Sequence, residues 1–255
     1  MNALFLISLI MYHRSDIMMV KEMMLMEKII TIYHGSNKII ESPLYGFGRK
    51  NNDFGLGFYC TLENELAKEW AVSPFEDGYS NCYKIDTEYL KILDLTDSKY
   101  SILNWIAVLV EHRLFSLNNP IASKARQYLI DNFSLNVNAY DIIIGYRADD
   151  SYFDYAEAFL NNNITVLQLA KAMNLGRLGK QIVIKSKYAF SLLKYQGYED
   201  ADRKKYLIKR KYRNDKANEE YLKIIEETAN DLYISDIIRG GIKNEDARIP
   251  RNICK

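Results

Sequence analysis

Two glycines stand before an apparent β-strand in this chain, whereas a dinucleotide-binding fingerprint has its glycines after one. The segment from Asn52 to Gly57 leads directly into the apolar and aromatic run 57–61, which has the composition of a strand. A Rossmann fold needs a strand, then a glycine-rich turn, then the N-terminus of a helix. The sixth-position glycine of that fingerprint is also missing. The order of these residues therefore excludes a Rossmann fold.

The other periodic patterns alternate irregularly between strand and helix. Strands are expected at 29–33, 81–86, 90–95, 140–145 and 181–185, and helices after Thr61, at 101–117, at 121–131, after Tyr152 and from Thr165 to Met173. From about Glu199 onward the pattern is mostly helical and heavily charged. This order favours an α+β fold over a doubly wound α/β fold.

The first 25 residues match neither a folded element nor a targeting segment. The apolar run from Leu4 to Met11 is shorter than the about 20 residues that cross a bilayer. It has no basic segment before it and no small-residue cleavage site after it. We therefore expect residues 1–25 to be a disordered or mis-assigned extension, residues 26–197 to form the main domain, and residues 198–255 to form a helical C-terminal extension.

Charge and cysteine content limit the classes of function. A net charge of +1 provides no overall field that would attract nucleic acid or a membrane surface. The three cysteines, Cys60, Cys82 and Cys254, are widely spaced, and no histidine lies at ligand spacing from them. These features favour a reduced, cytoplasmic protein with no structural metal ion and no membrane partner.

Three segments place polar residues beside glycines or at the start of a strand. Tyr33-His34-Gly35-Ser36 ends the first expected strand, Gly55-Leu56-Gly57-Phe58-Tyr59 opens the second, and Gln181 opens the strand 181–184. These segments resemble the three signatures of the ADP-ribosyltransferases. The resemblance is to the branch with a His-Tyr-Glu arrangement, which includes diphtheria-type toxins and poly(ADP-ribose) polymerases.

Within that superfamily the chain is most similar to an uncharacterised bacterial family. Its marks are the Asp53-Phe54-Gly55-x-Gly57-Phe58-Tyr59 motif, the later Ala148-Asp149-Asp150, and a glutamine at the third signature. The resemblance covers roughly residues 28–215. It implies an ADP-ribosyltransferase-like split β-sheet with flanking helices. It also implies that NAD is the substrate and that ADP-ribose passes to a macromolecular acceptor, either protein or nucleic acid. Because such bacterial relatives are often toxins, an antitoxin-like protein is an expected partner.

The resemblance assigns roles to individual residues. His34 would bond a ribose hydroxyl, and the Gly35 backbone would hold the nicotinamide amide. Tyr59 would pack its ring on the nicotinamide, a flat contact worth about 0.5–1.5 kcal/mol beyond its area. The remaining cleft wall would come from Ser36, Asp53, Gly55, Gly57 and Thr61. The Thr61 side chain either bonds the ligand or caps the helix that follows it.

Gln181 departs from the pattern of well-studied transferases, which have a glutamate at this position. Cleavage of NAD passes through an oxocarbenium-like state, and loss of one well-placed electrostatic group costs roughly 100- to 1000-fold in rate. Either the protein is a slow or inactive relative, or another carboxylate supplies the charge. Asp149 and Asp150 are candidates because they follow the strand 140–145. They could equally cap a helix that begins near Ser151.

Three further interpretations remain open. The basic segment 203–213, with Tyr206 and Tyr212 interleaved, suits nucleic acid, but a solvated helix face balanced by nearby glutamates is the favoured interpretation. As a whole, the chain could also be a non-catalytic module that binds NAD or a related nucleotide. A third class of function is a structural interaction protein that uses its tyrosine-rich helices.

Overall fold

The computed structural model describes residues 28–116, 119–148, 151–175, 179–227 and 230–252. The expectation for residues 1–25 and the roles considered for Asp149 and Asp150 therefore lie outside the described residues. Within the described ranges, strands and helices follow one another irregularly along the chain, which confirms the α+β class.

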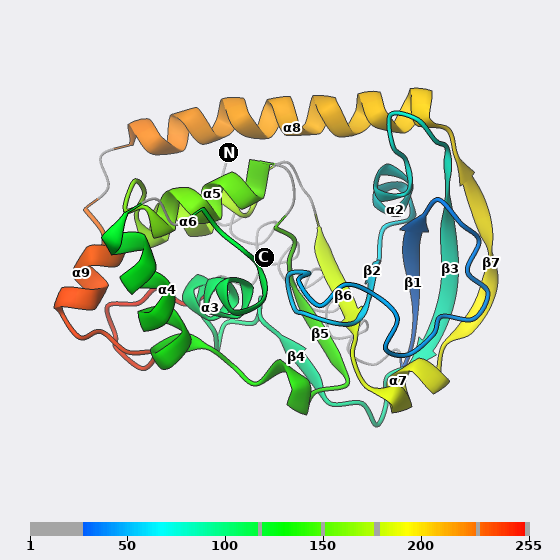
Figure 1. Cartoon of the computed structure of the whole chain (residues 1–255), viewed down its shortest axis with the longest axis horizontal. Helices are drawn as coiled ribbons and strands as arrows, with labels where there is room; N and C mark the ends of the chain where they lie inside the picture. The colour runs from blue at the N-terminus through cyan, green and yellow to red at the C-terminus, as the bar shows by residue number, and fades with distance from the viewer. Residues whose placement is uncertain (1–27, 117–118, 149–150, 176–178, 228–229, 253–255) are drawn as a thin grey trace, which may run out of the picture.

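Seven strands form one open sheet (Figure 1). Their order across the sheet is β4-β5-β6-β2-β1-β3-β7, and only β4 and β5 run parallel to each other. The strands are β1 (Ile29–Ser36), β2 (Phe58–Thr61), β3 (Gly78–Asp86), β4 (Ile92–Asp94), β5 (Ile142–Tyr146), β6 (Lys180–Ile184) and β7 (Lys194–Ala201). The sheet thus brings the three signature segments onto neighbouring strands, β1, β2 and β6.

The sheet is nearly divided between β1 and β2. The register joins these two strands at one pair of residues, Tyr33 opposite Thr61. By contrast, β1 pairs with β3 along its whole length, and β2 pairs with β6 along its whole length. We call β4-β5-β6-β2 the β6 half of the sheet and β1-β3-β7 the β3 half. The loop 37–57 connects the halves and crosses the near face of the sheet in Figure 1.

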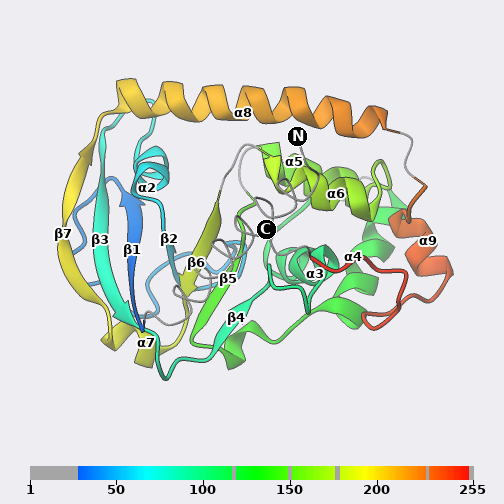
Figure 2. The ribbon, with the colours of Figure 1, turned by 180° about the vertical axis from the view of Figure 1, so that it is seen from behind.

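Helices cover both halves of the sheet. They are α2 (Asn64–Ala71), α3 (Ile102–His112), α4 (Pro120–Phe133), α5 (Ser151–Leu160), α6 (Val166–Ala172), α7 (Lys187–Ser191), α8 (Arg203–Glu226) and α9 (Ile234–Arg239), with a 3-10 turn at Val137–Ala139. Helix α2 packs on β1 and β3, whereas α3 to α6 gather beside the β6 half. Figure 2 shows the same division from behind.

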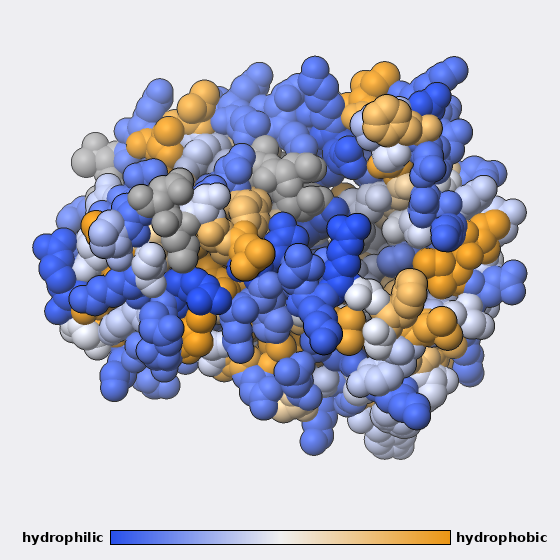
Figure 3. All heavy atoms as spheres, viewed as in Figure 1, coloured by the Kyte–Doolittle hydropathy of each residue, from blue (hydrophilic) through white to orange (hydrophobic). Residues whose placement is uncertain are grey.

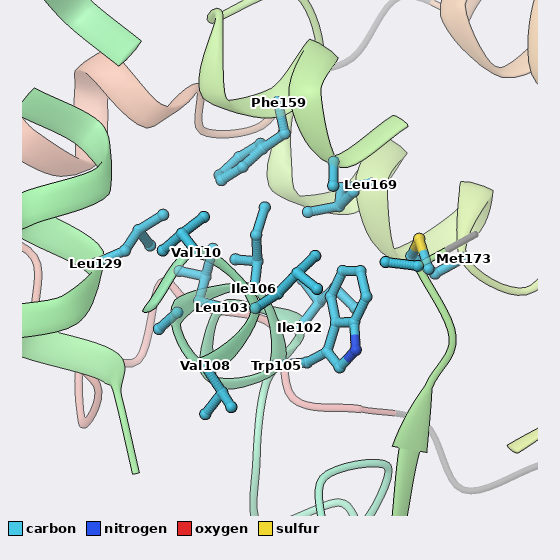
Figure 4. Close-up of a cluster of buried hydrophobic side chains, with 14 of the residues drawn as sticks. Ile102, Leu103, Trp105, Ile106, Val108, Val110, Leu129, Phe159, Leu169 and Met173 are labelled. Atoms are coloured by element: carbon cyan, nitrogen blue, oxygen red, sulfur yellow. The ribbon is translucent and has the colours of Figure 1, made fainter. Parts of the chain in front are cut away.

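The main hydrophobic core is centred on α3, whose residues from Ile102 to Val110 are all buried. Such a helix, apolar on all sides, must be enclosed by other elements. Figure 4 shows Ile106 of α3 beside Phe159 of α5 and Leu169 of α6. A capping box at Ser101 starts the helix in the interior of the molecule, where unpaired amide groups would otherwise be costly.

Helix α8 is the longest helix in the described part of the chain and joins the two sides of the molecule. It contacts α2 beside the β3 half and α5 and α6 beside the β6 half, and it runs along one edge of the molecule in Figures 1 and 2. Figure 3 shows orange apolar groups between the blue hydrophilic ones along that edge. The helix carries the exposed side chains of Ile208, Tyr212 and Leu222.

Some local expectations differ from the structure. The expected boundary between residues 197 and 198 falls inside β7, an edge strand that the charge pattern did not indicate. The helix after Thr61 begins later than expected, with Glu63 at its N-cap, and Thr61 Oγ1 accepts a hydrogen bond from the Glu63 amide. The helix expected from Thr165 is present as α6, and Thr165 and Gln168 form a capping box at its start.

Candidate active site

A cavity of about 630 Å³ opens where β1 and β2 separate. Its wall is formed by the end of β1, the loop 37–57 with the start of β2, part of α2, and residues beside the ends of α3, β5 and β6. Pockets for small molecules are commonly about 300–1,000 Å³ in volume. His34, Tyr59 and Gln181 all line this cavity. The fold therefore brings together three residues that lie far apart in sequence.

His34 is fixed at the end of β1 by contacts with β2. Its Nδ1 lies 2.7 Å from the Tyr59 carbonyl oxygen, and because a carbonyl oxygen can only accept, Nδ1 carries the proton. The ring stacks on Phe58, with centroids 4.3 Å apart. Burial lowers the pKa of His34. The imidazole is therefore favoured in its neutral form, with Nε2 as a hydrogen-bond acceptor.

Residue 35 is a glycine because the backbone of β1 passes directly against α2 at this point. A Cβ at Gly35 would lie 2.0 Å from the Ala67 carbonyl oxygen, so no larger residue fits there without a shift of the backbone. The glycine thus allows β1 and α2 to approach closely and thereby fixes the position of its neighbour His34. Gly35 and Ser36 both line the cavity.

Tyr59 is a wall residue whose hydroxyl organises the loop before β2. Its Oη donates to the Gly55 carbonyl at 2.6 Å and accepts from the Phe54 amide at 3.0 Å. Gly55 has a φ of +72°, and a Cβ there would lie 2.5 Å from the His112 ring, which explains the glycine. Lys185 Nζ donates to the carbonyls of Phe54 and Leu56, each at 2.8 Å. The 54–57 turn is thus fixed in front of β2.

Gln181 and Asp53 form a buried pair at the β6 side of the cavity. Gln181 Nε2 donates to Asp53 Oδ2 and to the Tyr146 carbonyl oxygen, at 2.8 Å each. The Ala148 amide also donates to Asp53 Oδ2, at 2.9 Å, and Arg113 Nη1 lies 3.5 Å from Asp53 Oδ1. Burial raises the pKa of Asp53, whereas these donors act in the opposite direction.

The cavity lining is rich in arginine. Arg49, Arg113 and Arg147 line it, and Asp53 is the one carboxylate among the lining residues that the structure describes. The Arg147 guanidinium lies 3.9 Å from the centroid of the Trp70 ring, a contact that joins the β6 half to α2. Trp70 also lines the cavity, and its Nε1 is buried with no hydrogen-bond partner among the described residues. These groups offer cationic and donor contacts to an anionic ligand.

The predicted site residues that the structure describes divide into two groups. The cavity lining contains His34, Gly35, Ser36, Asp53, Gly57, Tyr59 and Gln181. Gly55 and Thr61 do not belong to that lining. Gly55 lines a smaller second cavity of about 290 Å³, and the Thr61 side chain is buried. The prediction that these two residues contact a ligand therefore has no support from the geometry, since both have structural roles.

Sequence reasoning missed the arginines and the part played by Trp70. Arg147 follows the buried strand β5 directly, so a position at the rim of the sheet could have been inferred for it. Arg113 directly follows α3 and Arg49 lies in the loop 37–57, and neither stands in a local pattern that marks a binding residue. Trp70 packs partly against the core and also lines the cavity.

The described ranges contain neither a candidate metal site nor a candidate membrane-spanning helix. There, no group of three or more His, Cys, Asp or Glu side chains is arranged to hold a metal ion. None of the helices in the same ranges combines the length and the apolar character that spanning a bilayer requires.

Comparisons with known proteins identify a family. No curated protein and no solved structure matches the chain. A family model described as "Protein of unknown function (DUF3990)" matches residues 30–195, a span that begins in β1 and ends in β7 and contains every lining residue discussed above. Since this match covers more than half of the sequence, the chain belongs to the DUF3990 family.

Proposed function

We propose that the protein cleaves NAD and transfers ADP-ribose to a macromolecular acceptor. The bond between nicotinamide N1 and ribose C1′ breaks, and its electron pair leaves with nicotinamide. A nucleophilic atom of the acceptor forms the new bond to C1′ and loses its proton. The observation that carries this proposal is that His34, Tyr59 and Gln181 line one cavity at the point where β1 and β2 separate.

The lining of the cavity suits the separate parts of NAD. The neutral His34 ring can accept a hydrogen bond from a ribose hydroxyl through Nε2, because Nδ1 is already bonded to the Tyr59 carbonyl. Aromatic rings of Tyr59 and Trp70 are available to the flat pyridine and adenine groups. Arginine is the preferred partner of phosphate oxygens, and the arginines of the lining can bind the diphosphate. Each part of the ligand therefore has a matching group in the wall.

Release of nicotinamide from NAD tests the proposed chemistry. We expect the wild-type protein to release nicotinamide, measured by chromatography, and His34→Ala and Tyr59→Ala to release it at least about tenfold more slowly, a loss of about 1.4 kcal/mol or more. Tyr89→Ala is the matched control, because Tyr89 is 79% exposed and lies outside the cavity lining. If the wild-type protein releases no nicotinamide, the proposal is wrong, whether or not NAD stabilises the protein against heat.

The acceptor is identified by incubating the protein with labelled NAD in a cell extract. We expect the label to appear on a macromolecule, and digestion with protease or nuclease then distinguishes protein from nucleic acid. An antitoxin-like partner remains a prediction that rests on the resemblance to bacterial toxins. Label that stays entirely on small molecules would contradict a macromolecular acceptor.

A second candidate function is a nucleotide-binding module without catalysis. It is favoured by Gln181, which is uncharged and uses Nε2 to bond Asp53 and a backbone carbonyl. For such a module, NAD at 100 times its dissociation constant would add about 2.7 kcal/mol to the free energy of unfolding, while no nicotinamide would be released. Measuring both quantities on the same sample separates the two functions.

A further inference from the structure

We infer that Asp53 supplies the negative charge of this site, and that residue 181 is a glutamine because it must donate a hydrogen bond to that carboxylate. The inference deepens the proposed function and rests on it. It also explains why residue 181 is a glutamine, whereas well-studied transferases have a glutamate at this position. Asp53 belongs to the loop that precedes β2, whereas Gln181 belongs to β6.

The described groups that face Gln181 Nε2 are both hydrogen-bond acceptors. Its Nε2 lies 2.8 Å from both the Asp53 carboxylate and the Tyr146 carbonyl oxygen. The same carbonyl accepts a bond from the indole Nε1 of Trp105, at 2.9 Å, so it is anchored by the core helix α3. An ionised glutamate at position 181 would point an oxygen at two other oxygens. Like charges at such separations repel, so the position requires a donor.

The partners that the Asp53 carboxylate has among the described residues, in contrast, are all donors. The Ala148 amide, the Gln181 amide group and the Arg113 guanidinium all face the carboxylate. These contacts come from three separate parts of the chain and fix the carboxylate in one orientation. A preorganised charge of this kind stabilises opposite charge that develops in a transition state. Since Asp53 lines the same cavity as His34, its field acts on the cation that forms at ribose C1′.

An exchange of the two residues tests the inference. The set comprises the wild type, Asp53→Asn, Gln181→Glu and the double variant Asp53→Asn/Gln181→Glu, with nicotinamide release measured as kcat and KM. Asp94→Asn is the matched control. Asp94 also accepts from a backbone amide and a side chain at a strand end, those of Thr96, but it lies outside the cavity lining. Thermal unfolding of each variant verifies that it is folded.

Because the charge acts in the transition state, we expect Asp53→Asn to lower kcat by about 100-fold or more with little change in KM. Gln181→Glu should lower kcat at least about tenfold, since it places a second carboxylate beside the first. The double variant has one carboxylate and one amide again, with their positions exchanged. It should recover at least about tenfold over Asp53→Asn, so the inference remains testable even if one single variant does not fold.

The opposite outcomes would overturn the inference. If Gln181→Glu raises kcat above the wild-type value while Asp53→Asn leaves it unchanged, position 181 is the site of the charge and the assignment to Asp53 is wrong. A double variant that folds but is no more active than Asp53→Asn would also contradict it. If the wild-type protein binds NAD without releasing nicotinamide, or does not bind it at all, the proposed function itself fails, and that result is distinct from either of these.

Discussion

At the scale of single residues, two contacts fix the His34 ring: a hydrogen bond at Nδ1 and stacking on the ring of Phe58. Both contacts leave Nε2 as the remaining polar atom of the ring. Burial favours the neutral imidazole because a charged ring would lose its hydration. The residue is therefore suited to accept a hydrogen bond at neutral pH, and protonation would remove that capacity.

The lowered pKa of His34 predicts a dependence of stability on pH. Since the folded pKa lies below the unfolded value of about 6.5, the unfolded chain binds more protons at mildly acidic pH. Above about pH 6.5 His34 is neutral in both the folded and the unfolded chain, so its burial is not penalised. As the pH falls below that value, protonation of the unfolded chain lowers the free energy of unfolding. We expect the wild type to lose more unfolding free energy than His34→Asn between about pH 7.5 and about pH 5.5. Urea denaturation at both pH values measures this difference. Equal losses would contradict the prediction.

At the scale of elements, the basic segment of α8 binds α2 through ion pairs and a hydrogen bond. Arg213 Nη2 and Nε lie 2.5 and 3.0 Å from Glu69 Oε2, and both side chains are largely buried. Lys209 lies 2.9 Å from Glu65 Oε2, and Tyr206 donates to the other oxygen of Glu65 at 3.0 Å. Two carboxylates of α2 thus pair with Lys209 and Arg213, which favours a helix face over a nucleic-acid patch for these two residues.

Removing one partner of the buried pair should destabilise the protein strongly. Arg213→Met removes both close donors from the buried Glu69 Oε2 and leaves Glu69 with the more distant Lys209, 3.9 Å from its Oε1; loss of one partner of a buried pair costs about 3–5 kcal/mol. The double variant Arg213→Met/Glu69→Gln should cost less than Arg213→Met alone, because no buried charge remains unpaired. Chemical denaturation of the two single variants and the double variant gives the coupling free energy. Strictly additive effects would show that the pair does not couple α8 to α2.

The elements differ in how far the sequence could predict them. The apolar run Ile142-Ile143-Ile144 predicted β5, and the apolar spacing after Ser101 predicted α3, because burial imposes a pattern on the residues of the core. Strand β7 was missed because it is an edge strand with mostly exposed, polar residues. Its position depends on pairing with β3, which lies far away in the sequence.

The residues of the candidate site also differ in how far the sequence could predict them. Its signature residues His34, Tyr59 and Gln181 stand in local motifs, and the motifs indicated that they would meet. Arg113 could not be predicted, since it contacts Asp53 only because the end of α3 packs beside the loop before β2. The partnership between Asp53 and Gln181 likewise depends on tertiary contacts. Sequence motifs therefore located the cavity, whereas its charge balance required the three-dimensional structure.

For the molecule as a whole, α8 braces the cavity. The N-terminal half of the helix is bound to α2 through Glu65 and Glu69, and the C-terminal half is bound to the helices beside the β6 half, where Tyr155 donates to Asn218 at 3.0 Å and stacks on Tyr221. The two cavity walls are joined directly at the pair Tyr33–Thr61 and by contacts such as that of His34 with Tyr59. A rigid α8 therefore helps to set the distance between the walls.

A break in α8 should weaken ligand binding at a distance. Lys211 is exposed near the middle of the helix, and a proline there costs about 3 kcal/mol or more in helix stability. We expect Lys211→Pro to bind NAD more weakly and to exchange backbone amide hydrogens faster in α2 and α5. Lys211→Ala, which removes the same charge and preserves the helix, should resemble the wild type. Unchanged binding by a folded Lys211→Pro protein would mean that α8 does not brace the cavity.

The stacking of Arg147 on Trp70 has a consequence for the intrinsic fluorescence of the protein. The chain has two tryptophans. Trp105 is fully buried in the core, whereas the indole of Trp70 lies at the cavity wall beneath a guanidinium group. A molecule that enters the cavity and displaces Arg147 changes the emission of one fluorophore and leaves the other as an internal reference. The protein thus contains its own reporter of occupancy, and ligands can be screened by intrinsic fluorescence without a dye or a tag.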